Sequence, residues 1–168
     1  DASFAITGGQ PKQIALKMPN GFAASLSARP ACSNTDAAAG NCAATSQIGT
    51  ASLTVDTFSG SETGTGAVYL TEGPTGDDAG GAAAEIQFSF GTLITQGGAY
   101  LVENGKNQYL DLRNIPLDVN GTAINATNLS VSLSGANSFL TNPSSCATSA
   151  WVSTGTSHAG AASQVFSV

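Results

Sequence analysis

Apolar and polar residues alternate with a period of two along much of the chain, which is the pattern of half-buried β-strands. The alternation is clearest in residues 2–7, 13–18 and 85–90, where every second residue is Ala, Ile, Leu, Met or Phe. Shorter apolar stretches predict further strands at residues 48–58, 67–70, 129–133, 150–152 and 164–168. Glycine-rich segments at 71–81 and 153–160 interrupt this pattern and are predicted as loops.

The clearest predicted hairpin spans residues 100–112, where apolar alternation flanks Asn104-Gly105 on both sides. Asn-Gly supplies the positive φ angles that a type I′ turn requires, so we expect these two residues in the turn. A helical signal occurs only around residues 34–39, where a short capped turn is expected to end at Gly40.

Many short strands, with a turn signal every ten residues or so, indicate a β-sandwich or a barrel. The strand lengths are uneven, which favours the sandwich. We therefore predict one all-β domain over residues 1–168, an antiparallel β-sandwich of the Ig-like or Greek-key type. At most one short helix is expected.

Composition and charge narrow the range of functions. Charged residues are 10% of the chain and 20 of its 168 residues are glycine, whereas about a quarter of a typical domain is charged. A surface made of hydroxyl groups and small side chains suits an extracellular protein that packs closely against its neighbours. The net charge of −6, with five scattered basic residues, argues against nucleic acids and anionic membrane surfaces as partners. No apolar run reaches the roughly 20 residues that a spanning helix needs.

The chain begins at Asp1 and enters a strand-like segment at once. This is the form expected of a mature product after removal of a signal peptide, and it predicts an extracellular or cell-surface location. Three cysteines fit that oxidising environment. Cys32 and Cys42 flank a short loop that a disulfide can close, which favours this pair and leaves Cys146 as a buried small apolar residue. A Cys42–Cys146 bridge is the main alternative.

No catalytic machinery is evident. His158, the single histidine, is placed in a predicted loop, where solvent exposure is a more common role than general-base catalysis. Trp151 lies in a late strand, where a core position is favoured over a sugar-binding platform. We therefore expect no enzyme activity, no catalytic residues and no cofactor. Asp77 and Asp78 are weak candidates for calcium ligands, because two adjacent aspartates without a ligand repeat do not define a site.

Three Asn-x-Ser/Thr sequons cluster at Asn120, Asn125 and Asn128. If the source organism glycosylates asparagine, this stretch is expected to be exposed.

An ordered set of short motifs runs from residue 30 to the C-terminus: Cys32, the segment 36–42 ending in Cys42, Gln47-Ile-Gly-Thr50, Val68-Tyr-Leu70 and Asn142-Pro-Ser-Ser-Cys146. This order resembles a domain of large secreted and surface proteins of actinobacteria, although Ala43 stands where proline is usual. The resemblance implies an extracellular β-domain and carries over no catalytic residues.

The N-terminal strand carries the leading functional hypothesis. Residues 1–8 are uncharged after Asp1, apolar on one phase, and followed by the flexible pair Gly8-Gly9. Such a strand can complete its own sheet or cross into a neighbouring subunit and complete that one. Head-to-tail exchange of residues 1–9, anchored by Ala2, Phe4 and Ile6, would build a homopolymeric surface filament or pilus.

Two alternatives remain open. The first strand can simply belong to a monomeric domain. The protein can also act as an adhesin or carbohydrate-binding module, with a glycan or other surface ligand contacting loops 71–81 and 153–160.

Overall fold

The computed structural model describes residues 2–6, 9–19, 21, 23–25, 27–72, 83–90, 93–104, 107–113, 115–119, 121–133, 139–141, 152–160 and 165–167. Within these residues the fold is all-β, as predicted, with antiparallel pairing between all the named strands. The helical content comprises α1 (Asn34–Ala38) and a 3-10 turn, η1 (Ala44–Ser46). The short helix therefore lies where the sequence predicts it.

Ten strands form one hydrogen-bonded sheet. In spatial order they are β1 (Ala2–Ala5), β11 (Asn125–Leu133), β4 (Gln47–Thr57), β5 (Gly60–Leu70), β6 (Ala83–Phe90), β7 (Leu93–Asn104), β8 (Asn107–Arg113), β2 (Pro11–Lys17), β13 (Val152–Ser157) and β14 (Val165–Ser167). Two small sheets pair β9 (Asp118–Val119) with β10 (Thr122–Ala123), and β3 (Ala23–Ala24) with β12 (Leu140–Thr141).

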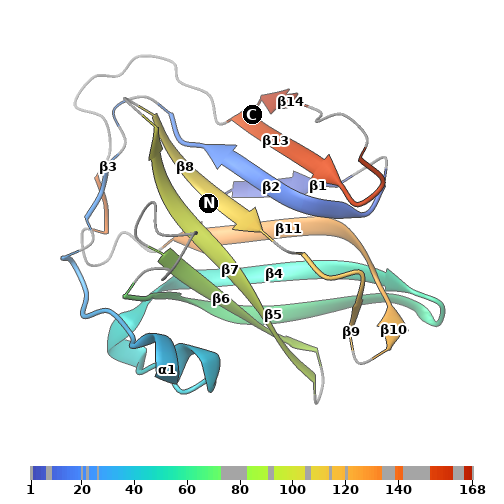
Figure 1. Ribbon diagram of the computed structural model, residues 1–168, viewed down its shortest axis with the longest axis horizontal. Helices are drawn as coiled ribbons and strands as arrows, with labels where there is room; N and C mark the ends of the chain where they lie inside the picture. Colours follow the sequence, from blue (N-terminus) through green and yellow to red (C-terminus); the bar gives the residue numbers. More distant parts are fainter. Residues whose placement is uncertain are drawn as a thin grey trace.

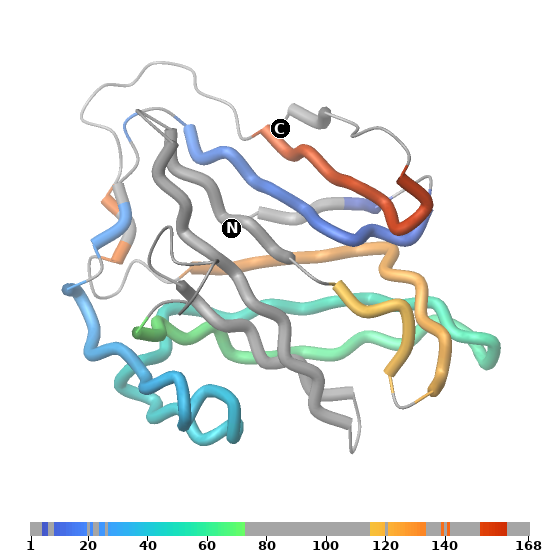
Figure 2. Tube along the Cα trace, in the orientation of Figure 1, coloured from blue at the N-terminus to red at the C-terminus, as the bar shows by residue number. Residues whose placement is uncertain are grey.

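The chain path combines a meander with a Greek-key return. Strands β4 to β8 follow one another in the sheet, and β11 then returns to pair with β4, the first strand of the meander. Figure 1 shows β7 and β8 crossing diagonally between two layers, one with β2 and β13 and the other with β4, β5 and β11. Figure 2 shows the same two layers, and the sheet is sandwich-like because it folds over on itself.

The main core lies between these layers. Leu16 of β2 is 0% exposed, and Ile14 and Leu16 pack with buried residues of β4, β5 and β11. The full set is Ile14, Leu16, Met18, Ile48, Ala51, Val68, Leu70, Leu129, Val131 and Phe139. Alternate residues of β2 and β11 point inward, among them Ile14 with Leu16 and Leu129 with Val131, which explains their apolar alternation. Each fully buried side chain of this size contributes about 1.5–3 kcal/mol through removal from water.

A second, smaller cluster lies at the end of the sheet where the β4–β5 hairpin turns. It contains buried Val55, Ile124 and Ala126, with Val119 packed against it. Ile6 and Leu53 pack against both clusters. The residue that follows β1 therefore lies where the main core meets the smaller one.

Several predicted boundaries differ from the structure. Residues 153–157 belong to β13, between β2 and β14, and not to a loop. Their Ser, Thr and Gly content hides the strand, because its stability comes from hydrogen bonds to two neighbours. Strand β5 likewise begins at Gly60, through a polar half without apolar alternation.

The predicted hairpin forms, but its turn is displaced by one residue. Asn104 ends β7 and pairs with Asn107 of β8, so the two connecting positions are 105 and 106, which lie outside the described residues. The inter-strand register, and not the Asn-Gly pair, determines where this turn begins.

Candidate functional site: the N-terminal strand and the hairpin groove

The N-terminal strand β1 forms one edge of the ten-stranded sheet, and among the described strands it pairs with β11 alone. Ala2 is opposite Val131 and Phe4 is opposite Leu129, so the apolar phase of β1 is in register with the buried phase of β11. Ile6 extends the pairing by donating its N–H to the carbonyl of Thr127 over 2.8 Å. In this structure β1 therefore completes the sheet of its own chain.

A short segment links this strand to the rest of the fold. Gly9 has a φ of 140°, in the region that glycine occupies far more readily than other residues. Gln10 is anchored at both ends: its Nε2 donates to the carbonyl of Ile124 over 3.1 Å, and its carbonyl accepts from the N–H of His158 over 3.0 Å. Residues 7–9, of which Gly9 is described, connect Ile6 to this anchored residue.

A groove lies beside this connection, between the tip of the β4–β5 hairpin and the β9–β10 hairpin. We call it the hairpin groove; its volume is about 280 Å³, and it is lined by Val55, Thr57, Phe58, Ser59, Glu62, Val119, Thr122 and Ile124. Its floor is apolar because Val55 and Ile124 belong to the smaller core cluster. Phe58, by contrast, is 93% exposed at the hairpin tip.

Backbone geometry determines the shape of the β9–β10 side of the groove. Val119 is paired with Thr122, so two positions connect the strands: position 120, outside the described residues, and Gly121. The N–H of Gly121 donates to the carboxylate of Asp118 over 3.2 Å, which is a common way for aspartate to stabilise a turn. This hairpin holds Val119 against the smaller core cluster.

Two exposed side chains of opposite charge lie on the elements that form the groove and the anchored start of β2. Glu62 lines the groove and is exposed. Lys12, also exposed, lies two residues after Gln10 at the start of β2, and its carbonyl accepts from the N–H of Ile115. Within the described residues neither of these side chains has an ion-pair or hydrogen-bond partner.

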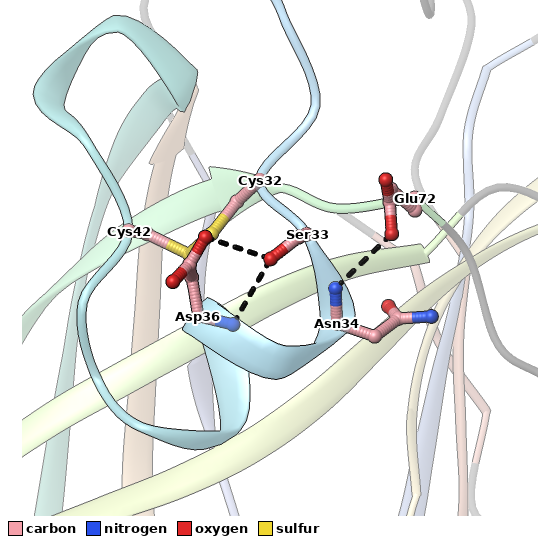
Figure 3. Close-up of a disulfide and its surroundings, with 6 residues drawn as sticks. All are labelled: Cys32, Ser33, Asn34, Asp36, Cys42 and Glu72. Carbon is pink, nitrogen blue, oxygen red and sulfur yellow. Dashed lines mark hydrogen bonds between the residues drawn. A yellow bond between two sulfur atoms is a disulfide. The ribbon is translucent and has the colours of Figure 1, made fainter.

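The disulfide joins Cys32 to Cys42, the pair that the sequence favours, with an S–S distance of 2.03 Å. It closes the loop that carries α1 (Figure 3). The loop is joined to the end of β5, because the N–H of Cys32 donates to Leu70 and the N–H of Glu72 donates to Cys32. Cys42 is thus not bonded to Cys146, which lies outside the described residues.

The first turn of α1 is capped twice, as Figure 3 shows. The Ser33 hydroxyl accepts from the N–H of Asp36 over 3.1 Å, and a Glu72 carboxylate oxygen accepts from the N–H of Asn34 over 3.3 Å. Caps of this kind satisfy amide donors that a helix leaves unpaired. These contacts are structural and contribute no reactive group.

Two of the three sequons lie within a strand that has neighbours on both sides. Asn128 is paired across to both Ala5 and Thr54. Asn125 Oδ1 is buried without a hydrogen-bond partner, and the Thr127 hydroxyl of the same sequon donates to the Thr54 carbonyl over 3.3 Å. The Asn125 side chain is half-buried and its oxygen is covered, and whether these sequons carry glycans stays a prediction. Asn120 falls outside the described residues.

The remaining candidate residues do not assemble a catalytic or metal site in the described part of the chain. His158 is exposed, and its Nε2 is 2.8 Å from the Ile115 carbonyl oxygen. This contact tethers the end of β13 to the segment before β9. Among the described residues no three His, Cys, Asp or Glu side chains lie together as metal ligands. Asp77, Asp78 and Trp151 are outside them.

No family model, curated protein or solved structure matches this chain. The resemblance to actinobacterial surface domains therefore rests on the sequence motifs alone. Of the helices that the structure describes, none has the length and apolar character to cross a membrane.

Sequence reasoning missed the hairpin groove. Its floor combines Val55 with Val119 and Ile124, which follow more than 60 positions later and share no pattern with it. Two local signals were available. Asn120-Gly121 is a hairpin signal that also forms part of a sequon. Phe58 is a large apolar residue between Thr57 and Ser59, two positions before Gly60.

Proposed function

We propose that this protein is a non-catalytic, extracellular structural subunit of a cell-surface filament, in which β1 of one copy pairs with β11 of the next. The observation that carries the proposal is the position of β1. It is a four-residue edge strand, bonded on one side only within the described residues, and residues 7–9 join it to the body.

Strand exchange requires little change in the contacts of the strand. A β1 supplied by a second copy makes the same backbone hydrogen bonds to residues 127–131 as the strand of the same chain, because the register is defined by β11. The free-energy difference between the two arrangements then depends on the connection and on any new contact between the bodies. The low proportion of charged residues also favours close packing of copies.

A mixed-disulfide experiment tests the exchange directly. Ser3 and Ser130 are opposite each other in the register, and facing Cα atoms in antiparallel pairs lie about 4.5–5.5 Å apart, which a disulfide can span. Ser3→Cys and Ser130→Cys are introduced into separate chains, both with Cys146→Ala. The two chains are unfolded together at acidic pH, refolded, concentrated and then oxidised.

Exchange predicts a covalent dimer of one Ser3→Cys chain and one Ser130→Cys chain. Each variant alone serves as the control, because a Ser3–Ser3 or Ser130–Ser130 pairing does not occur in the exchanged register. If the mixture yields only monomers by mass spectrometry, strand exchange is excluded.

Negative-stain microscopy then distinguishes the possible assemblies. One-way exchange yields open filaments, and removal of residues 1–8 abolishes them. Filaments that persist after this deletion would exclude the donor strand. If microscopy shows only closed dimers formed by reciprocal exchange, the proposed filament is wrong and the proposed strand exchange stands.

A further inference from the structure

We infer that the hairpin groove is a second contact between copies, covered by the body of the copy whose β1 is paired with β11. This inference rests on the proposed strand exchange and adds to it the surface on which the two bodies meet. The partner is a second copy of this chain.

The length of the connection determines where the donor body lies. Ile6 is bonded to Thr127, and Gln10 is bonded to Ile124 and His158 of the body. Four Cα–Cα steps separate Ile6 from Gln10, and an extended chain of this length spans at most about 14 Å. A donor body therefore lies within about 14 Å of the acceptor's Ile6 position, at the end of the sheet that holds the hairpin groove.

The groove has the chemistry of a contact surface. Val55 and Ile124 are 3% and 7% exposed and form an apolar floor, while Phe58 projects at its rim with 93% of its surface exposed. Ile6 packs against the same cluster as this floor, so the groove is continuous with the site that the exchanged segment occupies. Exposed aromatic residues beside apolar pockets are frequent energetic centres of protein interfaces.

Charge also favours a second copy of this chain. The acceptor's groove presents Glu62, and the donor's first anchored residues present Lys12, only two positions after Gln10. Both side chains are exposed and lack ion-pair partners in the part of the chain that the structure describes. The whole chain carries a net charge of −6, so a contact that brings Lys12 of one copy to Glu62 of the next offsets part of the repulsion between two copies.

The substitution Phe58→Ser tests the contact without disturbing the fold, since the side chain is almost fully exposed. We expect the concentration at which assembly is half complete to rise about tenfold or more, the scale of a lost interface aromatic. Light scattering measures assembly, and the thermal midpoint should remain that of the parent chain. Asn41→Ser, an exposed position in the loop of α1 at the other end of the molecule, is the matched control.

The mixed-disulfide reporter separates the two proposals. If Phe58→Ser assembles at the parent's concentration while mixed disulfides still form, the groove contact is wrong and the exchange stands. If the parent itself forms no mixed disulfide, the exchange and the groove contact are both excluded.

A charge swap tests the orientation of the two bodies. Lys12→Glu and Glu62→Lys should each raise the assembly concentration several-fold at low salt, and the double variant should return it close to the parent value. A double variant that assembles no better than the weaker single variant would show that Lys12 does not face Glu62 and would overturn this arrangement.

Discussion

The N–H of Ile6 donates to the carbonyl oxygen of Thr127, and Ile6 packs against both apolar clusters. This bond marks the boundary between a segment that pairs only with β11 and a connection of three residues. Gln10, four positions later, is bonded to Ile124 and His158. Detachment of the N-terminal segment therefore leaves the anchored start of β2 in place.

The connection should be sensitive to the conformation of Gly9. Gly9→Ala places a side chain at a φ of 140°, although its Cβ meets only the Ser157 Cβ at 3.8 Å, an ordinary contact. We expect a loss of about 1–2 kcal/mol in the free energy of unfolding, due to backbone strain, measured by urea denaturation. Gly155→Ala is the control, because its backbone is unstrained and its Cβ meets the Gln13 carbonyl at 3.5 Å. Equal stability of the two variants would contradict the strain at Gly9.

A second glycine is required for a different reason, the close approach of two strands. A Cβ on Gly49 of β4 would overlap the carbonyl oxygen of Ser132 in β11, so the backbones must separate to accommodate it. Gly49→Ala should therefore cost about 3 kcal/mol or more, seen as a large fall in the urea midpoint. If the variant is as stable as Gly155→Ala, the close approach of β4 and β11 at this point is incorrect.

The Cys32–Cys42 disulfide should stabilise the fold through a short loop. With a sequence separation of 10, loop-closure entropy predicts a contribution of about 3 kcal/mol. Replacement of both cysteines by serine should lower the thermal midpoint, measured by circular dichroism. Thiol titration of the unfolded, unreduced protein should detect one thiol per chain, that of Cys146. Peptide mapping that finds Cys146 linked to either partner would refute the pairing.

Truncation of two large apolar residues to alanine should change the free energy of unfolding by very different amounts. Leu16 is 0% exposed in the main core, and Leu16→Ala should cost about 2–5 kcal/mol through lost burial and a residual cavity. Phe58→Ala should change the free energy of unfolding of the monomer by less than about 0.5 kcal/mol, because the side chain is 93% exposed. Chemical denaturation at a concentration below assembly provides the comparison. A large loss at Phe58 would show that it packs within its own chain.

Period-two alternation was a reliable guide wherever one face of a strand is buried. It located β2, most of β4 and much of β11, since Ile14, Leu16 and Leu129 must all face the core. It failed for β13 and for the first half of β5, whose polar residues are held in strands by hydrogen bonds to neighbours distant in sequence.

The features of the candidate site also fall into two groups, those that the local sequence indicates and those that depend on distant residues. The apolar phase of residues 2–6 and the closely spaced Cys32–Cys42 pair are local features, and the sequence alone indicates both. Which strand pairs with β1, and that Gln10 is held beside Ile124, are long-range facts with no local signal.

By itself, then, the sequence determined the all-β class, the short helix and the apolar character of the first strand, because these depend on neighbours two to four positions apart. Only the tertiary structure decided that β1 is an edge strand, that β13 is not a loop, and that a groove lies between the β4–β5 and β9–β10 hairpins. The physical reason is that a sheet is defined by pairing between distant segments. Its edges and grooves appear only when all the strands are in register.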